Sequence, residues 1–287
     1  WAPIVTEREE PQAVIGSNMH KLAFPKWYKE HVANGRKLKY GHEHPGHDIS
    51  THLTHPRMKS EILNLQVRGE YLYAACGEAG FRVFDVAMYD NKAFAERITT
   101  SPVSPFFGQR FFIRTKYCTD IASPSTVAPD PTRPGDGKKY FEQPVSMFYA
   151  FIYVVDKYEG LIPVLAATLL DSNPNNNFLE RAYTFNPDGI LDGAVRITLV
   201  GTNAYICCDA GIVVINLSDP FKPKVVHTIG TDIVKHPHAF QAQFRYGYCC
   251  DEEGIKVFDM TDLDHPQPVS KLELPHAHNI YLARTYG

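Results

Sequence analysis

Residues 205–216 read YICCDAGIVVIN, and residues 248–259 read YCCDEEGIKVFD. Each stretch opens with a tyrosine and small or apolar residues, passes through a short polar turn, and continues after Gly211 or Gly254 with an alternating apolar run. Alternation with a period of two and enrichment in Val, Ile, Phe and Tyr are typical of strands, and glycine supplies the positive φ of a tight hairpin. The two stretches therefore predict two copies of one strand–turn–strand repeat.

Two earlier stretches follow the same pattern. Residues 73–85 read YAACGEAGFRVFD and residues 153–165 read YVVDKYEGLIPVL, with Gly80 and Gly160 at the repeat position. The last two repeat glycines are 43 residues apart, and a period of about 40–45 residues suits one four-stranded blade of a β-propeller. At the end of the chain, the residues from His278 onward parallel those from His238, which predicts the start of a fifth repeat.

The fold class predicted from these repeats is all-β: a β-propeller with four recognisable blades plus the start of a fifth, over residues 61–287. One blade cannot bury both faces of its sheet, so we expect the blades to stack around an axis. Within each blade, the Asp or Asn after the second strand (Asp85, Asn216 and Asp259) is predicted to close an Asx turn. A proline-containing loop then leads to an outer strand, such as residues 224–229.

Three segments interrupt the repeats. Residues 1–60 are predicted to be an irregular N-terminal arm rich in His, Pro and Lys, with a short helix at 25–32. Residues 101–148 are an insertion rich in Pro and turn residues, and long loops of this kind are often functional or interface-forming. A smaller insertion after residue 170 is expected to contain a helical turn at 178–182.

The composition excludes several classes of protein. A net charge of −3 provides no basic field for phosphate backbones, so nucleic acid is not an expected partner. No run of about 18 apolar residues occurs, so no membrane span is expected. The six cysteines form no CxxC or CxxCH motif, so covalent haem c attachment within these residues is not expected. The chain opens on Trp1 and stops at Gly287 where a repeat restarts, so we expect a removed leader or a longer product.

The strongest candidate site is a histidine-rich segment of the arm. Residues 41–57 read GHEHPGHDISTHLTHPR and hold five of the 13 histidines. Imidazole is a common ligand of zinc, copper, iron and haem iron, so we predict that this segment binds a metal ion or supplies an axial ligand to a haem held elsewhere. The alternative is a polar arm whose histidines bond to backbone and water. The candidate ligands are His42, His44, His47, His52 and His55.

Three weaker candidates have simpler structural explanations. The histidines at the repeat starts could form a polar ring, but loop histidines at blade junctions are favoured. The paired cysteines could form a disulfide or a soft-metal site, but small core residues are favoured. Residues 171–177 with Glu180 resemble the start of a calcium loop, although an Asx-rich helix cap explains them better. The residues concerned in the first two groups are His236, His238, His276 and His278, and Cys207, Cys208, Cys249 and Cys250.

The segments YICCDAGIVVINLSDPFKPKVV and YCCDEEGIKVFDMTDLDHPQPV resemble the LVIVD repeat family in their Gly, their apolar triad and their Asp-Pro-x-x-Pro tail. The resemblance covers about residues 61–287 with gaps. It implies a β-propeller in an exported bacterial or archaeal protein, frequently associated with multihaem c-type cytochromes. Cysteine pairs replace the small residues that are usual in the family.

Taken together, these features predict a non-catalytic β-propeller subunit or domain of an extracytoplasmic electron-transfer assembly, periplasmic or extracellular. It would dock a multihaem c-type cytochrome or another redox protein within a larger complex. Haem c would be bound mainly by another segment or chain, with one arm histidine as a further axial ligand. One alternative is a metal-dependent enzyme centred on His42 to His55, and another is a surface adhesion or scaffold protein.

Overall fold

The computed structural model describes residues 61–69, 71–86, 103–104, 108–109, 112–124, 146–167 and 179–283. Within these residues the regular structure is almost all β, with short 3-10 helices at Met147–Ala150 and Pro187–Gly189. The chain divides into two compact units. One comprises residues 1–114, 123–152 and 164–182, and the other comprises residues 115–122, 153–163 and 183–287.

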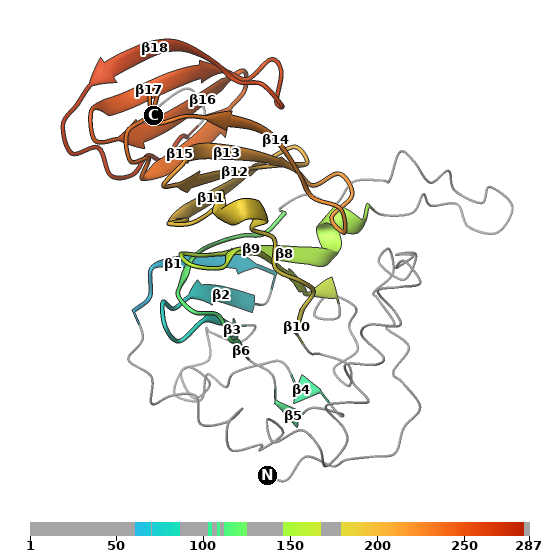
Figure 1. Cartoon of the computed structure of the whole chain (residues 1–287). Helices are drawn as coiled ribbons and strands as arrows, with labels where there is room; N and C mark the ends of the chain where they lie inside the picture. Colours follow the sequence, from blue (N-terminus) through green and yellow to red (C-terminus); the bar gives the residue numbers. More distant parts are fainter. Residues whose placement is uncertain are drawn as a thin grey trace, which may run out of the picture. The chain divides into compact units, whose positions relative to one another are not determined.

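The described strands form four antiparallel four-stranded sheets (Figure 1). The first sheet has the order β1 (Asn64–Arg68), β2 (Tyr71–Ala75), β3 (Phe81–Asp85), β6 (Phe112–Ile113). The second has the order β7 (Cys118–Ala122), β8 (Phe151–Asp156), β9 (Gly160–Leu165), β10 (Glu180–Arg181). The third consists of β11 (Arg196–Val200), β12 (Asn203–Cys208), β13 (Gly211–Asn216), β14 (Lys224–Ile229). The fourth consists of β15 (Ala239–Gln243), β16 (Tyr246–Asp251), β17 (Gly254–Asp259), β18 (Gln267–Glu273), and β4 (Val103–Ser104) and β5 (Gly108–Gln109) form a separate ladder.

The hairpins predicted from the repeats are confirmed. Each predicted strand–turn–strand stretch forms the second and third strands of one sheet. The four repeat glycines have positive φ values, 74° at Gly80, 79° at Gly160, 109° at Gly211 and 143° at Gly254. A residue with a side chain rarely adopts these values, so glycine at these positions is required by the turn itself.

The predicted outer strand of the third sheet and the predicted turns of the third and fourth sheets are also present. The outer strand β14 spans Lys224–Ile229. The side-chain oxygen of Asn216 accepts a hydrogen bond from the Ser218 amide at 3.0 Å, and that of Asp259 accepts one from the Thr261 amide at 2.8 Å. The Asx turns predicted after the second strands of these two repeats are therefore present.

The helical turn predicted at 178–182 is wrong. Glu180 and Arg181 form β10 and pair with Leu165 and Val164 of β9. Extended pairing with an available sheet edge has overridden the local helical preference of these residues. The helix predicted at 25–32 lies outside the described residues.

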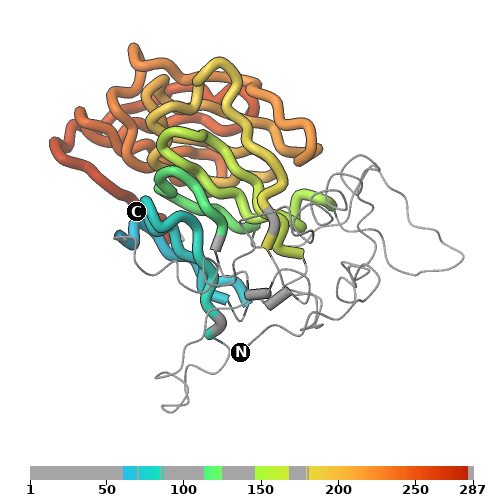
Figure 2. The backbone as a smooth tube through the Cα atoms, turned by 60° about the horizontal axis from the view of Figure 1, so that its bottom comes forward, coloured from blue at the N-terminus to red at the C-terminus, as the bar shows by residue number. Residues whose placement is uncertain are grey.

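The third and fourth sheets pack face to face, and both views of the backbone show them side by side (Figure 2). We call the side of each sheet that carries the repeat tyrosine its Tyr face. The Tyr205 ring of the third sheet stacks on Phe240 of the fourth, with centroids 4.8 Å apart and planes inclined by 14°. The core between the two sheets contains Tyr205, Cys207, Ile212, Val214, Ile229, Val234, Phe240, Cys249, Phe258 and Met260.

Candidate functional site

The five arm histidines lie outside the described residues, as do residues 171–177. The described part of the chain contains no group of three or more His, Cys, Asp or Glu placed to hold a metal ion. None of its helices is both long and apolar enough to cross a membrane. The side chains whose geometry can define a candidate site therefore lie on the described sheets, chiefly on the fourth sheet.

Three repeat-start histidines come together beside the fourth sheet. The ring centroids of His238 and His278 are 5.2 Å apart, and those of His276 and His278 are 6.4 Å apart. His236 and His276 occupy equivalent repeat positions and share a left-handed backbone, with φ of 48° and 65°. The backbone at the predicted start of the fifth repeat thus resembles that at the start of the fourth. Residues 279–282 form no strand in the described structure, so the fifth repeat stays a prediction.

A network of ion pairs lies at one end of the fourth sheet. The Lys256 ammonium is almost fully buried and lies 2.9 Å from Asp251 Oδ2 and 2.8 Å from Glu253 Oε2. It also donates a hydrogen bond to the carbonyl of Ile233, and Lys235 lies 3.1 Å from Glu253 Oε1. Burial acts to lower the pKa of Lys256, but the hydrogen bonds to the two carboxylates outweigh burial and the pKa is raised. Lys256 is therefore a fixed cation and unsuited to act as a general base.

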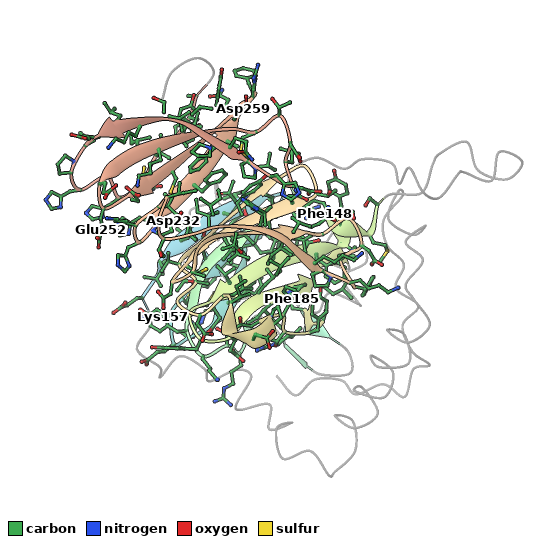
Figure 3. All side chains as sticks on the ribbon, turned by 45° about the horizontal axis from the view of Figure 1, so that its top comes forward. Phe148, Lys157, Phe185, Asp232, Glu252 and Asp259 are labelled. Atoms are coloured by element: carbon green, nitrogen blue, oxygen red, sulfur yellow. The ribbon has the colours of Figure 1, made fainter. Side chains whose placement is uncertain are left out.

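An open hollow of about 350 Å³ adjoins this network. Its lining comprises residues 252–256, residues 271–273 and Pro275, the residue before His276. Charges of both signs line it, because Glu252, Glu253 and Glu273 stand beside Lys256 and Lys271. In Figure 3 Glu252, which lines the hollow, and Asp259 lie at opposite ends of the fourth sheet. Such a mixed, open surface suits contact with a polar protein segment better than enclosure of a small substrate.

Two buried aspartates cap the repeat hairpins, and sequence reasoning missed both. Asp156 and Asp251 end β8 and β16, and both are fully buried. Oδ1 of Asp156 accepts hydrogen bonds from the amides of Tyr158 and Glu159, and Oδ2 accepts one from Tyr117. The signal was present in the sequence, because both repeats place Asp directly before the polar turn, in DKYEG and DEEG.

Asp251 repeats the same arrangement in the fourth sheet. Its Oδ1 accepts the amides of Glu253 and Gly254 at 3.0 and 3.1 Å, and its Oδ2 accepts the Lys235 amide at 2.9 Å. Each carboxylate thus closes its own hairpin and also fixes the segment that leads into the first strand of its sheet. Their role is structural, because every oxygen is already engaged by backbone donors.

A third buried aspartate joins the second and third sheets. Asp120 Oδ2 accepts the Ile197 amide at 2.8 Å, and Oδ1 accepts the Ile121 amide at the same distance. The Arg196 guanidinium lies 3.8 Å from Oδ2. Nearby, the Thr119 hydroxyl donates to the carbonyl of Ala194 at 2.8 Å. The first strands of these two sheets are therefore tied together by side-chain hydrogen bonds.

The six cysteines are all free and buried, and no disulfide joins them. Cys207 and Cys249 lie in the core between the third and fourth sheets, which confirms the favoured interpretation of these residues as core positions. Burial raises the pKa of the Cys207 thiol, and it raises that of Cys208 to about 11. A thiol held in its neutral form is a poor nucleophile and a poor metal ligand, because the thiolate is the reactive species.

Thiol accessibility follows from this burial. All six cysteines are expected to resist 5,5′-dithiobis(2-nitrobenzoate) in the native protein and to react when guanidinium unfolds it. Because reaction requires opening of the fold, we expect native rates at least about 100-fold below those of the unfolded chain. Rapid reaction of even one thiol under native conditions would contradict the packing described here.

Acid is expected to destabilise the fourth sheet. The hydrogen bonds from Lys256 and Lys235 lower the pKa of Glu253 from 4.5 to about 2. A carboxyl group with a depressed pKa stabilises the fold above its unfolded pKa and loses this contribution as the pH falls through the folded pKa. The urea midpoint should therefore fall as the pH is lowered from 4.5 towards 2, and less steeply in Glu253→Gln. Identical slopes in the two proteins would show that the ion pairs do not form in solution.

Comparison with known proteins supports the fold class alone. No protein family and no curated protein matches the sequence. Among solved structures, the periplasmic gluconolactonase PpgL of Pseudomonas aeruginosa is 11% identical with a TM-score of 0.50, over 75% of this chain and 55% of that one. A functionally unknown protein from Desulfotomaculum acetoxidans DSM 771 is 12% identical with a TM-score of 0.49, over 76% and 58%. The chain spans little more than half the length of either.

Proposed function

We propose that the four sheets are blades of a β-propeller. Each is a four-stranded antiparallel meander in chain order, and the last two repeats have the length of one blade. Successive sheets contact each other through their first strands, β7 with β11 and β11 with β15. Convergence of first strands, together with packing of one sheet's face on the next, is the arrangement expected of blades around an axis.

We further propose that this propeller is a non-catalytic module that docks a multihaem c-type cytochrome in an extracytoplasmic electron-transfer assembly. The observation that carries this proposal is that the repeated sheets use their reactive side chains internally. Thiols pack in the core, aspartates cap hairpins or join sheets, and Lys256 is held by carboxylates. The resemblance of the repeats to the LVIVD family supports the kind of partner.

The histidine arm is the element of the chain that we propose to meet the partner's haem. His42, His44 and His47 are closely spaced, so one imidazole can ligate iron while its neighbours bond to propionates or backbone. When bound, haem would supply the electron-transfer chemistry. The chain itself would contribute a ligand and a docking surface.

The test is the absorption spectrum of the complex isolated with a tagged full-length chain from cells that naturally make the protein. The proposal expects a Soret band and a haem-staining partner polypeptide. Replacing both His44 and His47 with Ala should change the coordination bands of the haem or release the partner. His265→Ala is the matched control, because His265 is an exposed histidine of the fourth sheet's loop and should have no effect.

Two other outcomes contradict the proposal, and a third contradicts the role of the arm alone. Stoichiometric zinc, copper or iron without haem, lost in the double arm variant, would favour the metal-dependent enzyme. A complex that contains neither haem nor metal would favour the adhesion or scaffold function. A spectrum unchanged in the arm variant would remove the arm from the site while leaving the docking function in place.

A further inference from the structure

The repeat tyrosine is fully buried in three sheets and partly exposed in the fourth. Tyr73, Tyr153 and Tyr205 are fully buried, whereas Tyr248 is only half-buried. The register makes these residues equivalent, because Tyr205 pairs with Val214 just as Tyr248 pairs with Val257. The Tyr face of the fourth sheet is therefore less completely covered than the Tyr faces of the other three sheets.

The opposite faces show the reverse pattern. On the first strand of each sheet, one residue pairs with the residue that follows the repeat tyrosine, and its side chain lies on the face opposite the Tyr face. These residues are Leu65, Ile121, Ile197 and Phe240. Their exposed fractions are 48%, 3%, 4% and 0%. The first sheet is thus the one whose opposite face is open, and Val67 on the same face is 64% exposed.

The contact between the third and fourth sheets shows what covers a Tyr face. Tyr205 stacks on Phe240, and its hydroxyl donates to the carbonyl of Leu263. Phe258 and Cys249 complete the covering surface. The occupant is therefore the opposite face of another sheet, with an apolar residue at the Phe240 position.

The Tyr face of the fourth sheet carries apolar residues at the positions that, in the third sheet, contact the opposite face of its neighbour. The register aligns Ile212 with Ile255 and Ile229 with Leu272. Leu272 is 59% exposed, although Ile229 is buried at the equivalent position. Ala277 and Ile280 pack against Cys250 and its neighbours and cover part of this face.

We propose that the Tyr face of the fourth sheet docks the opposite face of the first sheet of a second copy of this chain. The exposed apolar residues Leu65 and Val67 would take the place that Phe240 and its neighbours occupy on the third sheet. The two faces carry corresponding repeat positions, so the contact continues the established contact between the third and fourth sheets. The interface is heterologous, because one copy contributes its first sheet and the other its fourth.

The size of the contact sets the conditions of the experiment. A single sheet face is smaller than the interface of a stable complex, and contacts that bury less than about 1,200 Å² are commonly weak. The mass of the full chain should therefore be followed by light scattering after size exclusion at concentrations up to about 100 μM, where weak contacts become populated. The proposal expects a dimer or a larger assembly whose mass rises with concentration.

Two charge substitutions test the two faces separately. Leu65→Lys blocks the first-sheet face, and Leu272→Lys blocks the fourth-sheet face; both sites are exposed, so each variant should melt as the parent does. Each variant alone should be monomeric, because a heterologous contact needs both faces. A mixture of the two should recover a dimer, because each retains the face that the other has lost. Tyr158→Lys, at an exposed hairpin turn, is the control and should assemble as the parent does.

The opposite results overturn the proposal. A parent chain that stays monomeric at every concentration shows that a second copy does not cover the face. An assembly insensitive to both substitutions uses other surfaces. A mixture of the two variants that remains monomeric excludes the heterologous contact. None of these results bears on haem or the arm, so the docking function proposed above is tested separately.

Discussion

Replacing Tyr205 with Ala is expected to lower the free energy of unfolding by about 3–5 kcal/mol, the usual cost of truncating a fully buried large aromatic side chain. The ring stacks on Phe240, and the hydroxyl donates to the Leu263 carbonyl. The loss therefore combines a cavity between two sheets with the loss of one of two hydrogen bonds to the Leu263 carbonyl, which also accepts one from Asn203 Nδ2 at 3.0 Å. Tyr205→Phe removes only the hydrogen bond and should cost about 1 kcal/mol. Urea unfolding followed by circular dichroism measures both.

Tyr248→Ala is the matched control for this prediction. The residue holds the same register position in the fourth sheet, but it is half-buried. Its truncation should cost less than that of Tyr205, since less buried apolar surface returns to water. Equal costs in the two sheets would show that burial between sheets is not what the repeat tyrosine contributes.

The second large effect is expected at a repeat glycine. Gly211 has a φ of 109°, and a Cβ added there would overlap the carbonyl oxygen of Ile229 on the neighbouring strand β14. Backbone strain and overpacking each cost about 1–3 kcal/mol. Gly211→Ala should therefore lower the free energy of unfolding by about 3 kcal/mol or more, as measured by urea denaturation.

Gly69→Ala supplies the control for steric overlap. Gly69 also has a positive φ, 59°, but no atom lies within 4 Å of the position of an added Cβ. Only the cost of a left-handed backbone remains, about 1 kcal/mol. A Gly211→Ala variant as mild as Gly69→Ala would mean that the hairpin does not approach β14 as described.

The repeat hairpins could be predicted from sequence because their determinants are local. A positive-φ glycine after a polar turn, flanked by alternating apolar residues, fixes a hairpin without reference to the rest of the chain. The tendency of free cysteine to pack as a small apolar residue likewise predicted core positions for the paired cysteines, and Cys207 and Cys249 lie in the core. By contrast, β10 at Glu180–Arg181 is held by pairing with β9 and has no local signal of its own.

The structural roles of the aspartates could not be predicted for a related reason. Asp120 joins two sheets by accepting the amide of Ile197, a residue far along the chain. A sequence pattern of period two says which face a side chain occupies, but it does not say which backbone donor from another sheet will meet it. The hairpin caps formed by Asp156 and Asp251 are more accessible to prediction from sequence, because their hydrogen-bond donors include the next few residues of the turn.

The uncovered faces also needed the structure. Tyr248 and Tyr205 look alike in sequence, and only their exposure distinguishes them. Leu65 likewise holds the position that Phe240 fills in the fourth sheet, but its side chain is 48% exposed. Repetition in the sequence thus predicts the shape of a binding face, whereas its occupancy depends on which sheets are present.

A double-mutant cycle between Tyr205 and Phe240 measures the face-to-face stacking of the third and fourth sheets, on which the proposed blade architecture depends. The free energy of unfolding would be determined for the parent, Tyr205→Leu, Phe240→Leu and the double variant. Packed aromatic rings should give a coupling energy of about 0.5–1.5 kcal/mol. Costs that add to within about 0.3 kcal/mol would show that the two rings do not touch, and the stacked-sheet architecture would be wrong.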